Sequence, residues 1–420
     1  RPPNQDPATR GANRPALGTT AIGFSPPPRT GEEKPVRERR TAQRAERYKM
    51  QGVARDIIYR DGKYKNLEKP ASNHRVCNCR RARHGSEAKV HRSKEHRTAH
   101  CGGLQTCGSA WACPVCSALV QNRRRVEIEQ AIGWARGEGL EPVMVTLTFP
   151  HTRWDAVRDL LAKQSEALKK MRAGKWWQKF KARIGYEGMI RTLELTHGGE
   201  GGNGWHPHTH ELWFLGPGVT KEGLEEVITE RWLAACKKAG LVGDDPEKEG
   251  HFRAHAVDVV VSAEATAKYL TKTKLKATGT DLKNAWELAP ATASKSARSF
   301  NGRTPFQILA AAESDESEAR LFLEYVKATQ RKAMVFWSQG LKKRVGIDEK
   351  TDEEVAQEKQ DDADLLAVLT QEHWQRVVDE KARATILDLA ELGGYEAIAD
   401  WFAYHGIEPP PRESADDDPG

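Results

Sequence analysis

Segments with strand periodicity and segments with helix periodicity alternate in a fixed order in the middle of the chain. Strands are predicted at residues 143–149, 189–196, 208–215 and 254–261. Helices are predicted at residues 152–171, 221–239 and 262–276. The order β-α-β-β-α-β, followed by a further helix, predicts an α+β fold with a ferredoxin-like core, which we place at residues 139–276.

The segments on either side of this core differ from it in composition. Residues 1–36 are rich in proline and are expected to form a disordered arm. Residues 37–138 are expected to hold a basic segment and a metal-binding module that ends in a helix. After the core, residues 277–347 are expected to form a helical extension. Residues 348–420 are expected to form an acidic tail that contains an amphipathic helix near 363–390 and ends in a disordered ESADDDPG.

Charge is distributed unevenly along the 420 residues. Residues 1–125 hold 27 Lys and Arg against 10 Asp and Glu, whereas residues 346–420 hold 6 against 21. A basic first part indicates a polyanionic partner, and an acidic tail can limit or compete for that contact. A solvated basic arm without a partner is the alternative.

Six of the seven cysteines lie between Cys77 and Cys116. In a chain without a secretion signal such a cluster indicates a metal site rather than disulfides, and therefore a reducing cytosol. Cys113-Pro-Val-Cys116, followed by a helix, is typical of one half of a structural zinc site. The other half is Cys107 with Cys79 or, alternatively, Cys77, and Cys101, His74 and His100 compete.

Three histidines alternate in Trp205-His206-Pro207-His208-Thr209-His210. Because side chains alternate along a strand, His208 and His210 point to the same side and can bind one cation. Glu194 lies on the preceding predicted strand, beyond a glycine-rich turn, and is the candidate third ligand. His206 falls where the turn enters the strand and is ambiguous; a histidine-rich strand end without metal is the alternative.

Tyr269 and Lys272 lie three residues apart on the predicted helix 262–276, so they share a helix face. Near a divalent cation, such a phenol can act as a nucleophile on a phosphodiester, and the ammonium group can offset developing charge. By itself this pair is weak evidence for a catalytic site, because most Tyr/Lys pairs on helices serve only core packing and the solvent-exposed surface.

Other features of the sequence exclude some classes of protein function. The chain has no G-x4-G-K-[ST] phosphate loop and no G-x-S-x-G motif. No apolar run approaches the ~20 residues of a membrane span, so we expect no membrane partner and a cytoplasmic location. The row Arg123, Arg124 and Arg125, on the helix after the cysteine knuckle, is expected to contact DNA; a solvated charged face is the alternative.

Several motifs in fixed order resemble those of the HUH endonucleases, and among these the rolling-circle plasmid replication initiators. The core motifs are TLTFPH at 146–151, WHPHTHEL at 205–212 and KYLTK at 268–272. The resemblance extends over roughly residues 74–356, from GLQTCGSAWACPVC (103–116) to GRTPFQIL (302–309) and FWSQGLKKRVGI (336–347). The histidine motif precedes the tyrosine, as in replication initiators; conjugative relaxases have the reverse order.

The resemblance implies a mechanism. His208 and His210 match the paired metal ligands, for Mg²⁺ or Mn²⁺, and Tyr269 matches the nucleophile that nicks and rejoins single-stranded origin DNA. The implied product is a 5′-phosphotyrosine with a free 3′-hydroxyl, in a bacterial cell that supplies a helicase and a DNA polymerase. An HUH single-strand transposase and a non-catalytic, zinc-dependent DNA-binding protein are the alternatives.

The sequence departs from some relatives near the tyrosine. Those relatives carry a glutamate one turn earlier, where this chain has Ala265, and the nearest acidic residue is Glu264. Five residues separate Glu264 from Tyr269, which places them ~140° apart around a helix. The residue that would activate water for the terminating cleavage is therefore left unassigned.

Overall fold

The structure is a computed structural model that describes residues 33–63, 74–198, 201–261, 302–357 and 363–412. Its internal contacts divide the chain into two units, Arg1–Arg40 and Thr41–Gly420, and the second unit holds both β-sheets. The α+β class is confirmed. The predicted helix 262–276 lies outside the described residues, and so do Tyr269, Lys272 and Glu264.

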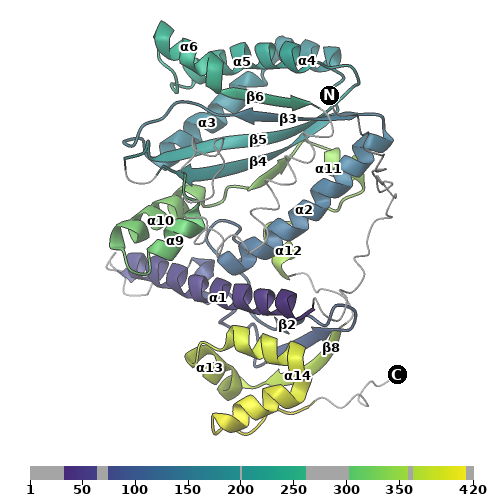
Figure 1. The fold of residues 1–420 in the computed structure, drawn as a ribbon, viewed down its shortest axis with the longest axis vertical. Coiled ribbons are helices and arrows are strands. Elements are labelled where there is room, and N and C mark those ends of the chain that lie inside the picture. The colour runs from purple at the N-terminus through teal and green to yellow at the C-terminus, as the bar shows by residue number, and fades with distance from the viewer. Residues whose placement is uncertain (1–32, 64–73, 199–200, 262–301, 358–362, 413–420) are drawn as a thin grey trace, which may run out of the picture. The chain divides into compact units, whose positions relative to one another are not determined.

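The larger sheet has five strands in the order β6-β3-β5-β4-β7, with every neighbouring pair antiparallel (Figure 1). Its strands are β3 (Glu141–Leu147), β4 (Gly188–His197), β5 (Trp205–Leu215), β6 (Val257–Val261) and β7 (Val335–Trp337). Two helices follow β3 and two follow β5: α3 (Val157–Met171), α4 (Gly174–Arg183), α5 (Lys221–Lys238) and α6 (Pro246–His255). Two β-α-β units therefore interleave, with β5 between β3 and β4.

The two faces of this sheet are buried by different helices. Val143, Val145 and Leu147 of β3 pack in one core with residues of α3 and α5. Met144 of the same strand packs on the opposite face, with Ile128 and other residues of α2 (Pro114–Gly137). Side-chain alternation along β3 thus separates two apolar layers.

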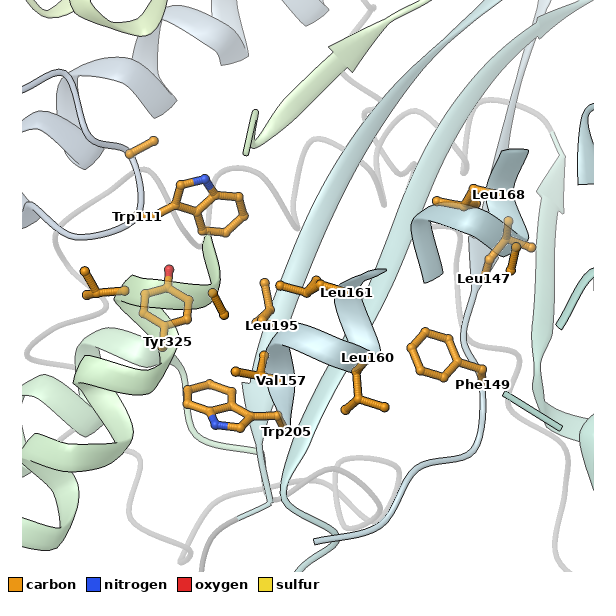
Figure 2. Packing of buried hydrophobic residues seen from close by; sticks show 14 of the residues in the cluster. Trp111, Leu147, Phe149, Val157, Leu160, Leu161, Leu168, Leu195, Trp205 and Tyr325 are labelled. Atoms are coloured by element: carbon orange, nitrogen blue, oxygen red, sulfur yellow. The ribbon is translucent and has the colours of Figure 1, made fainter. Parts of the chain in front are cut away.

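The first of these cores extends beyond the sheet to the helices near its edge (Figure 2). Trp205, at the start of β5, stacks on Tyr325 with ring centroids 5.6 Å apart, and Trp111 meets Tyr325 edge-on. The indole N–H of Trp205 donates to Glu324, so this buried tryptophan has a polar partner. The start of the histidine-bearing strand is therefore held by an aromatic cluster.

The remaining helices precede β3 or follow β6 in the sequence. They are α1 (Glu33–Lys63), the short 3₁₀ helix η1 (Arg75–Asn78), α9 (Pro305–Ala311), α10 (Glu316–Thr329), α11 (Leu341–Val345) and α12 (Asp352–Gln357). Thr304 caps α9 through a capping box with Gln307, and Pro305 occupies the first helical position.

A second sheet joins parts of the chain that the sequence analysis treated separately. Its order is β2-β1-β8, formed by β1 (Ala88–Ser93), β2 (Ala99–Gly102) and β8 (Ala363–Leu369). The helices α13 (Gln371–Asp379) and α14 (Arg383–Tyr404) follow, and α14 contacts all three strands. The acidic tail thus completes a sheet with the cysteine-rich segment.

The structure corrects three local predictions. Residues 363–369, expected to start an amphipathic helix, form a strand because they pair with β1. The predicted strand 254–261 begins only at Val257, because Asp245 caps α6 and that helix continues to His255. The histidine strand begins earlier than expected, at Trp205, and so includes His206. In addition, no helix of the described segments has the length and apolar character needed to cross a membrane.

Candidate metal centres

Glu194, His208 and His210 form a compact group of donor atoms on the large sheet. Glu194 is directly opposite His208 in the β4–β5 pairing. One oxygen of its carboxylate, Oε2, lies 3.1 Å from His208 Nε2 and 3.0 Å from His210 Nε2. All donor atoms lie within 4.8 Å of one another, so the structure brings together the three residues predicted from the sequence.

Neighbouring groups orient both imidazole rings. His210 Nδ1 lies 3.0 Å from the Thr146 hydroxyl, and His208 Nδ1 lies 3.4 Å from the carbonyl oxygen of His206, to which it can donate. With Nδ1 engaged in these contacts, Nε2 of each ring faces the Glu194 carboxylate. A nitrogen lone pair fixed in this way is what a metal ion requires of histidine.

Sequence analysis missed part of this arrangement. His206 Nε2 lies 3.1 Å from the Thr148 hydroxyl, and its Nδ1 lies 3.3 Å from Nδ1 of His151. Burial, and then the neighbouring His208, lower the pKa of His206 to about 3, so this ring is neutral at physiological pH. Thr146 lies on β3 and Thr148 directly follows it, and both alternate within the predicted strand 143–149. This alternation is the signal that could have placed both hydroxyls beside the three histidines of β5.

The second group consists of four buried thiols, from Cys79, Cys107, Cys113 and Cys116. The closest sulfur pairs are 3.4 Å, 3.6 Å and 3.8 Å apart. A tetrahedral zinc ion with Zn–S bonds of 2.3 Å needs sulfurs about 3.8 Å apart, so the donor set fits zinc. Cys79 rather than Cys77 belongs to the group. Cys101 lies outside it, and burial raises the pKa of Cys101 to about 11.

Hydrogen-bond donors surround the sulfurs. The backbone N–H of Cys107 points to Cys79 Sγ at 3.4 Å, and that of Ser109 to Cys107 Sγ at 3.4 Å. The side-chain amide of Gln51 donates to Cys113 Sγ at 3.2 Å, and Arg383 in turn donates to Gln51. Such donors stabilise thiolates, which are the form that binds zinc. Arg383 begins α14, so the tail reaches the neighbourhood of the cysteine group.

The loop that follows Cys107 packs closely against α12. A Cβ at Gly108, which has a φ of 62°, would lie 2.6 Å from the Cα atom of Glu353. Only glycine therefore permits both this backbone conformation and the approach of α12.

The arginine row after the cysteine knuckle differs from the expected DNA-contacting surface. Arg124 is buried, and its guanidinium pairs with Glu127 and Asp352 at 2.8 Å each. Arg125 pairs with Glu129 on its own helix, and the side chain of Arg123 is 41% exposed. Arg124 is thus committed to an internal ion-pair network, which corrects its assignment as a DNA contact; contacts by Arg123 and Arg125 stay a prediction.

Replacing Arg124 by Met is expected to lower the free energy of unfolding by about 3 kcal/mol, because Glu127 and Asp352 lose a buried cation. Arg125→Met, which breaks a partly exposed pair, is expected to cost less than about 1 kcal/mol. Urea unfolding of both variants measures this difference. Equal losses would show that the buried network does not carry the stability.

A family model described as "Replication protein" matches residues 102–381 of the sequence, which is more than half of the chain. The chain belongs to the replication protein family. This match confirms the family drawn from the motif order. It covers three of the four clustered cysteines and the whole Glu194 group, and it ends near the middle of the acidic tail.

Two curated relatives are similar to this replication protein. "Protein rep" of Streptomyces lividans is 27% identical over 304 residues, covering 59% of this chain and 65% of the relative. "Neomycin resistance protein" of Streptomyces cyanogenus is 33% identical over 139 residues, covering 27% of this chain and 31% of the relative. The chain therefore spans less than two thirds of the length of each. No solved structure matches it significantly.

Proposed function

We propose that this protein initiates rolling-circle replication of a plasmid by metal-dependent, tyrosine-mediated nicking and rejoining of single-stranded origin DNA. The observation that carries the proposal is the convergence of Glu194 with the Nε2 atoms of His208 and His210, in a chain of the replication protein family. A carboxylate and two oriented imidazoles form a donor set for a divalent cation beside the sheet.

The same three residues would hold Mg²⁺ or Mn²⁺. A divalent ion there would polarise a phosphate oxygen and stabilise the charge that develops on it. The chain's own contribution is orientation: Thr146 and the His206 carbonyl fix the rings, and Glu194 supplies the negative charge that balances a cation. The buried cysteine group would hold a structural zinc ion.

Tyr269 is the proposed nucleophile, a role that comes from the family resemblance. Lys272 is the proposed stabiliser of developing negative charge, because it lies three residues from Tyr269 on the same predicted helix. The phenol oxygen of Tyr269 bonds to phosphorus while the bond from phosphorus to the 3′ oxygen breaks. The phenol proton is lost, and the leaving 3′ oxygen takes up a proton, which gives a 3′-hydroxyl. The phosphotyrosine keeps the phosphoester, so the reverse reaction rejoins the strand without ATP.

The fold supports this assignment. We infer that β3 to β6 form the ferredoxin-like HUH core, within the range 139–276, and that the cysteine group organises a zinc module within 37–138. We place DNA contacts on Arg123 and Arg125. Partners are origin DNA, single-stranded or in a hairpin, and the host's helicase and DNA polymerase in the bacterial cytoplasm.

The decisive experiment incubates the full chain with single-stranded oligonucleotides that tile the cognate plasmid origin, in Mn²⁺ or Mg²⁺. We expect wild type to form an adduct that resists SDS and requires metal, and Tyr269→Phe to form none. Tyr404→Phe, at an exposed tyrosine on α14, is the matched control and is expected to react like wild type.

Three outcomes would contradict the proposal. An adduct that persists in Tyr269→Phe would move the nucleophile elsewhere. Tight binding of the origin by wild type without any adduct would favour a zinc-dependent DNA-binding protein. Adducts formed at transposon ends in preference to plasmid origins would favour the transposase alternative.

A further inference from the structure

Trp154 is the most solvent-exposed large hydrophobic side chain among the described residues, with 88% of its surface accessible. Tryptophan is highly buried on average, since its large ring gains much from leaving water. Trp154 lies between β3 and α3, in a connection that begins beside the candidate metal group. An indole exposed beside a candidate metal site is accessible to a ligand that reaches that site.

The connection is a fixed turn rather than a loose loop. Asp155 Oδ2 accepts hydrogen bonds from the backbone N–H and the hydroxyl of Thr152, at 2.7 Å and 2.8 Å. The backbone N–H of Trp154 donates to the Thr152 hydroxyl at 3.3 Å. These bonds, the backbone one first, hold the pKa of Asp155 below its usual value, so its carboxylate stays ionised at neutral pH. The indole is therefore presented by an ordered backbone.

Contacts on both sides of the turn at residues 151–155 place it next to the histidines of β5. The imidazole of His151 lies 4.7 Å, centroid to centroid, from that of His206, and His206 lies 5.0 Å from His208. On the other side, a Cβ at Gly204 would lie 2.9 Å from the Cα atom of Arg153, so only glycine allows this approach.

Trp154 follows His151 by three residues, so their Cα atoms are at most about 11 Å apart. A DNA strand advances 3.4 Å per nucleotide in duplex form and further when extended, so two or three nucleotides bridge this distance. Arg153 is exposed beside the indole and adds a positive charge. An aromatic ring next to a cation is the combination by which proteins bind single strands without reading sequence, since every base has a π face.

We propose that Trp154 stacks on a base of the single-stranded DNA close to the scissile phosphodiester, and that Arg153 contacts a phosphate beside it. The inference rests on the proposed function and adds a subsite to it. Stacking at this point anchors the strand as it enters the metal group. Trp154 is thus a substrate-positioning residue, whereas the chemistry belongs to other side chains.

The first test measures binding without cleavage, by fluorescence anisotropy of a fluorescein-labelled 20-mer of deoxythymidine in buffer without added Mg²⁺ or Mn²⁺. Trp154→Ala is expected to weaken the affinity of the full chain about tenfold, and Trp154→Phe less than threefold, because phenylalanine keeps a stacking face. Tyr404→Ala, which removes an equally exposed ring on α14, is expected to bind like wild type.

A second probe separates stacking from charge. An abasic strand of the same length offers phosphates without bases. Trp154→Ala and wild type are therefore expected to bind the abasic strand equally. Arg153→Ala is expected to weaken binding to both the abasic strand and the 20-mer. Photocrosslinking to a strand with 5-iododeoxyuridine should recover the peptide that contains Trp154. Equal affinity of Trp154→Ala and wild type for the 20-mer would overturn the stacking subsite.

These outcomes are distinct from a failure of the proposed function. If wild type forms the metal-dependent adduct and Trp154→Ala binds and reacts equally well, only the subsite is wrong. If wild type neither forms an adduct nor binds the 20-mer, the proposed function and the subsite fail together, and Trp154 serves another class of partner.

Discussion

His208→Ala is expected to lower metal-dependent nicking by more than about 100-fold. A change in a group that only orients a metal ligand typically costs 10–100-fold, so the loss of a ligand itself should exceed that range. His208 Nε2 lies 3.1 Å from the carboxylate of Glu194. Alanine has no side-chain atom that could bind a metal ion in its place. The rate of adduct formation with an origin oligonucleotide measures the effect.

Thr146→Val provides the graded control. It removes the hydroxyl 3.0 Å from His210 Nδ1 and keeps the shape of the side chain, so a loss of 10–100-fold is expected. A melting experiment separates metal binding from activity. Excess Mn²⁺ should raise the melting temperature of wild type and leave that of His208→Ala unchanged. A Mn²⁺-induced shift retained in His208→Ala would show that the ion binds elsewhere.

Cys113→Ser is expected to remove one equivalent of bound zinc and to lower the melting temperature by about 10 °C or more. Zinc bound by four thiolates contributes directly to folding free energy, and a loss of several kcal/mol moves the transition of a domain by this amount. The Gln51 amide, 3.2 Å from Cys113 Sγ, would face a neutral serine hydroxyl in place of a thiolate. Elemental analysis and calorimetry provide the two measurements.

Cys77 offers a matched control because it lies two residues from Cys79 and is also buried, yet is not part of the sulfur group. Cys77→Ser is expected to keep its zinc equivalent. Zinc lost from Cys77→Ser and kept by Cys79→Ser would reverse the choice between these two cysteines. Equal zinc content in wild type and Cys113→Ser would overturn the zinc site.

The sequence predicted the candidate centres better than it predicted the surrounding fold, for physical reasons. Glu194 and His208 belong to neighbouring strands joined by a short glycine-rich turn, so local pairing was enough to bring them together. Cys113 and Cys116 form a local knuckle, but the sequence named Cys79 with Cys77 as an alternative. Whether Cys77 or Cys79 points towards the other three sulfur atoms depends on how the 3₁₀ helix η1 turns. No strong sequence pattern predicts that turn.

Long-range pairing explains the main error in the tail. The segment 363–369 was expected to lie in an amphipathic helix. It is a strand because its backbone pairs with β1 and its side chains pack against α14. Propensity is a weak guide where a distant strand decides the outcome. The start of β6, by contrast, was predictable, because Asp245-Pro246 is a local signal for the helix that precedes it.

The pairing of β8 with β1 has a consequence for how the chain reaches its native state during synthesis. The ribosome delivers β1 early, whereas residues 363–369 emerge only after nearly all of the large sheet has been made. The small sheet therefore has a high contact order, and its third strand is supplied last. Until then one edge of β1 lacks the partner it has in the finished protein, and exposed strand edges favour aggregation. Slow translation or truncation before residue 363 should therefore reduce the soluble yield of the cysteine-rich module more than that of the five-stranded sheet.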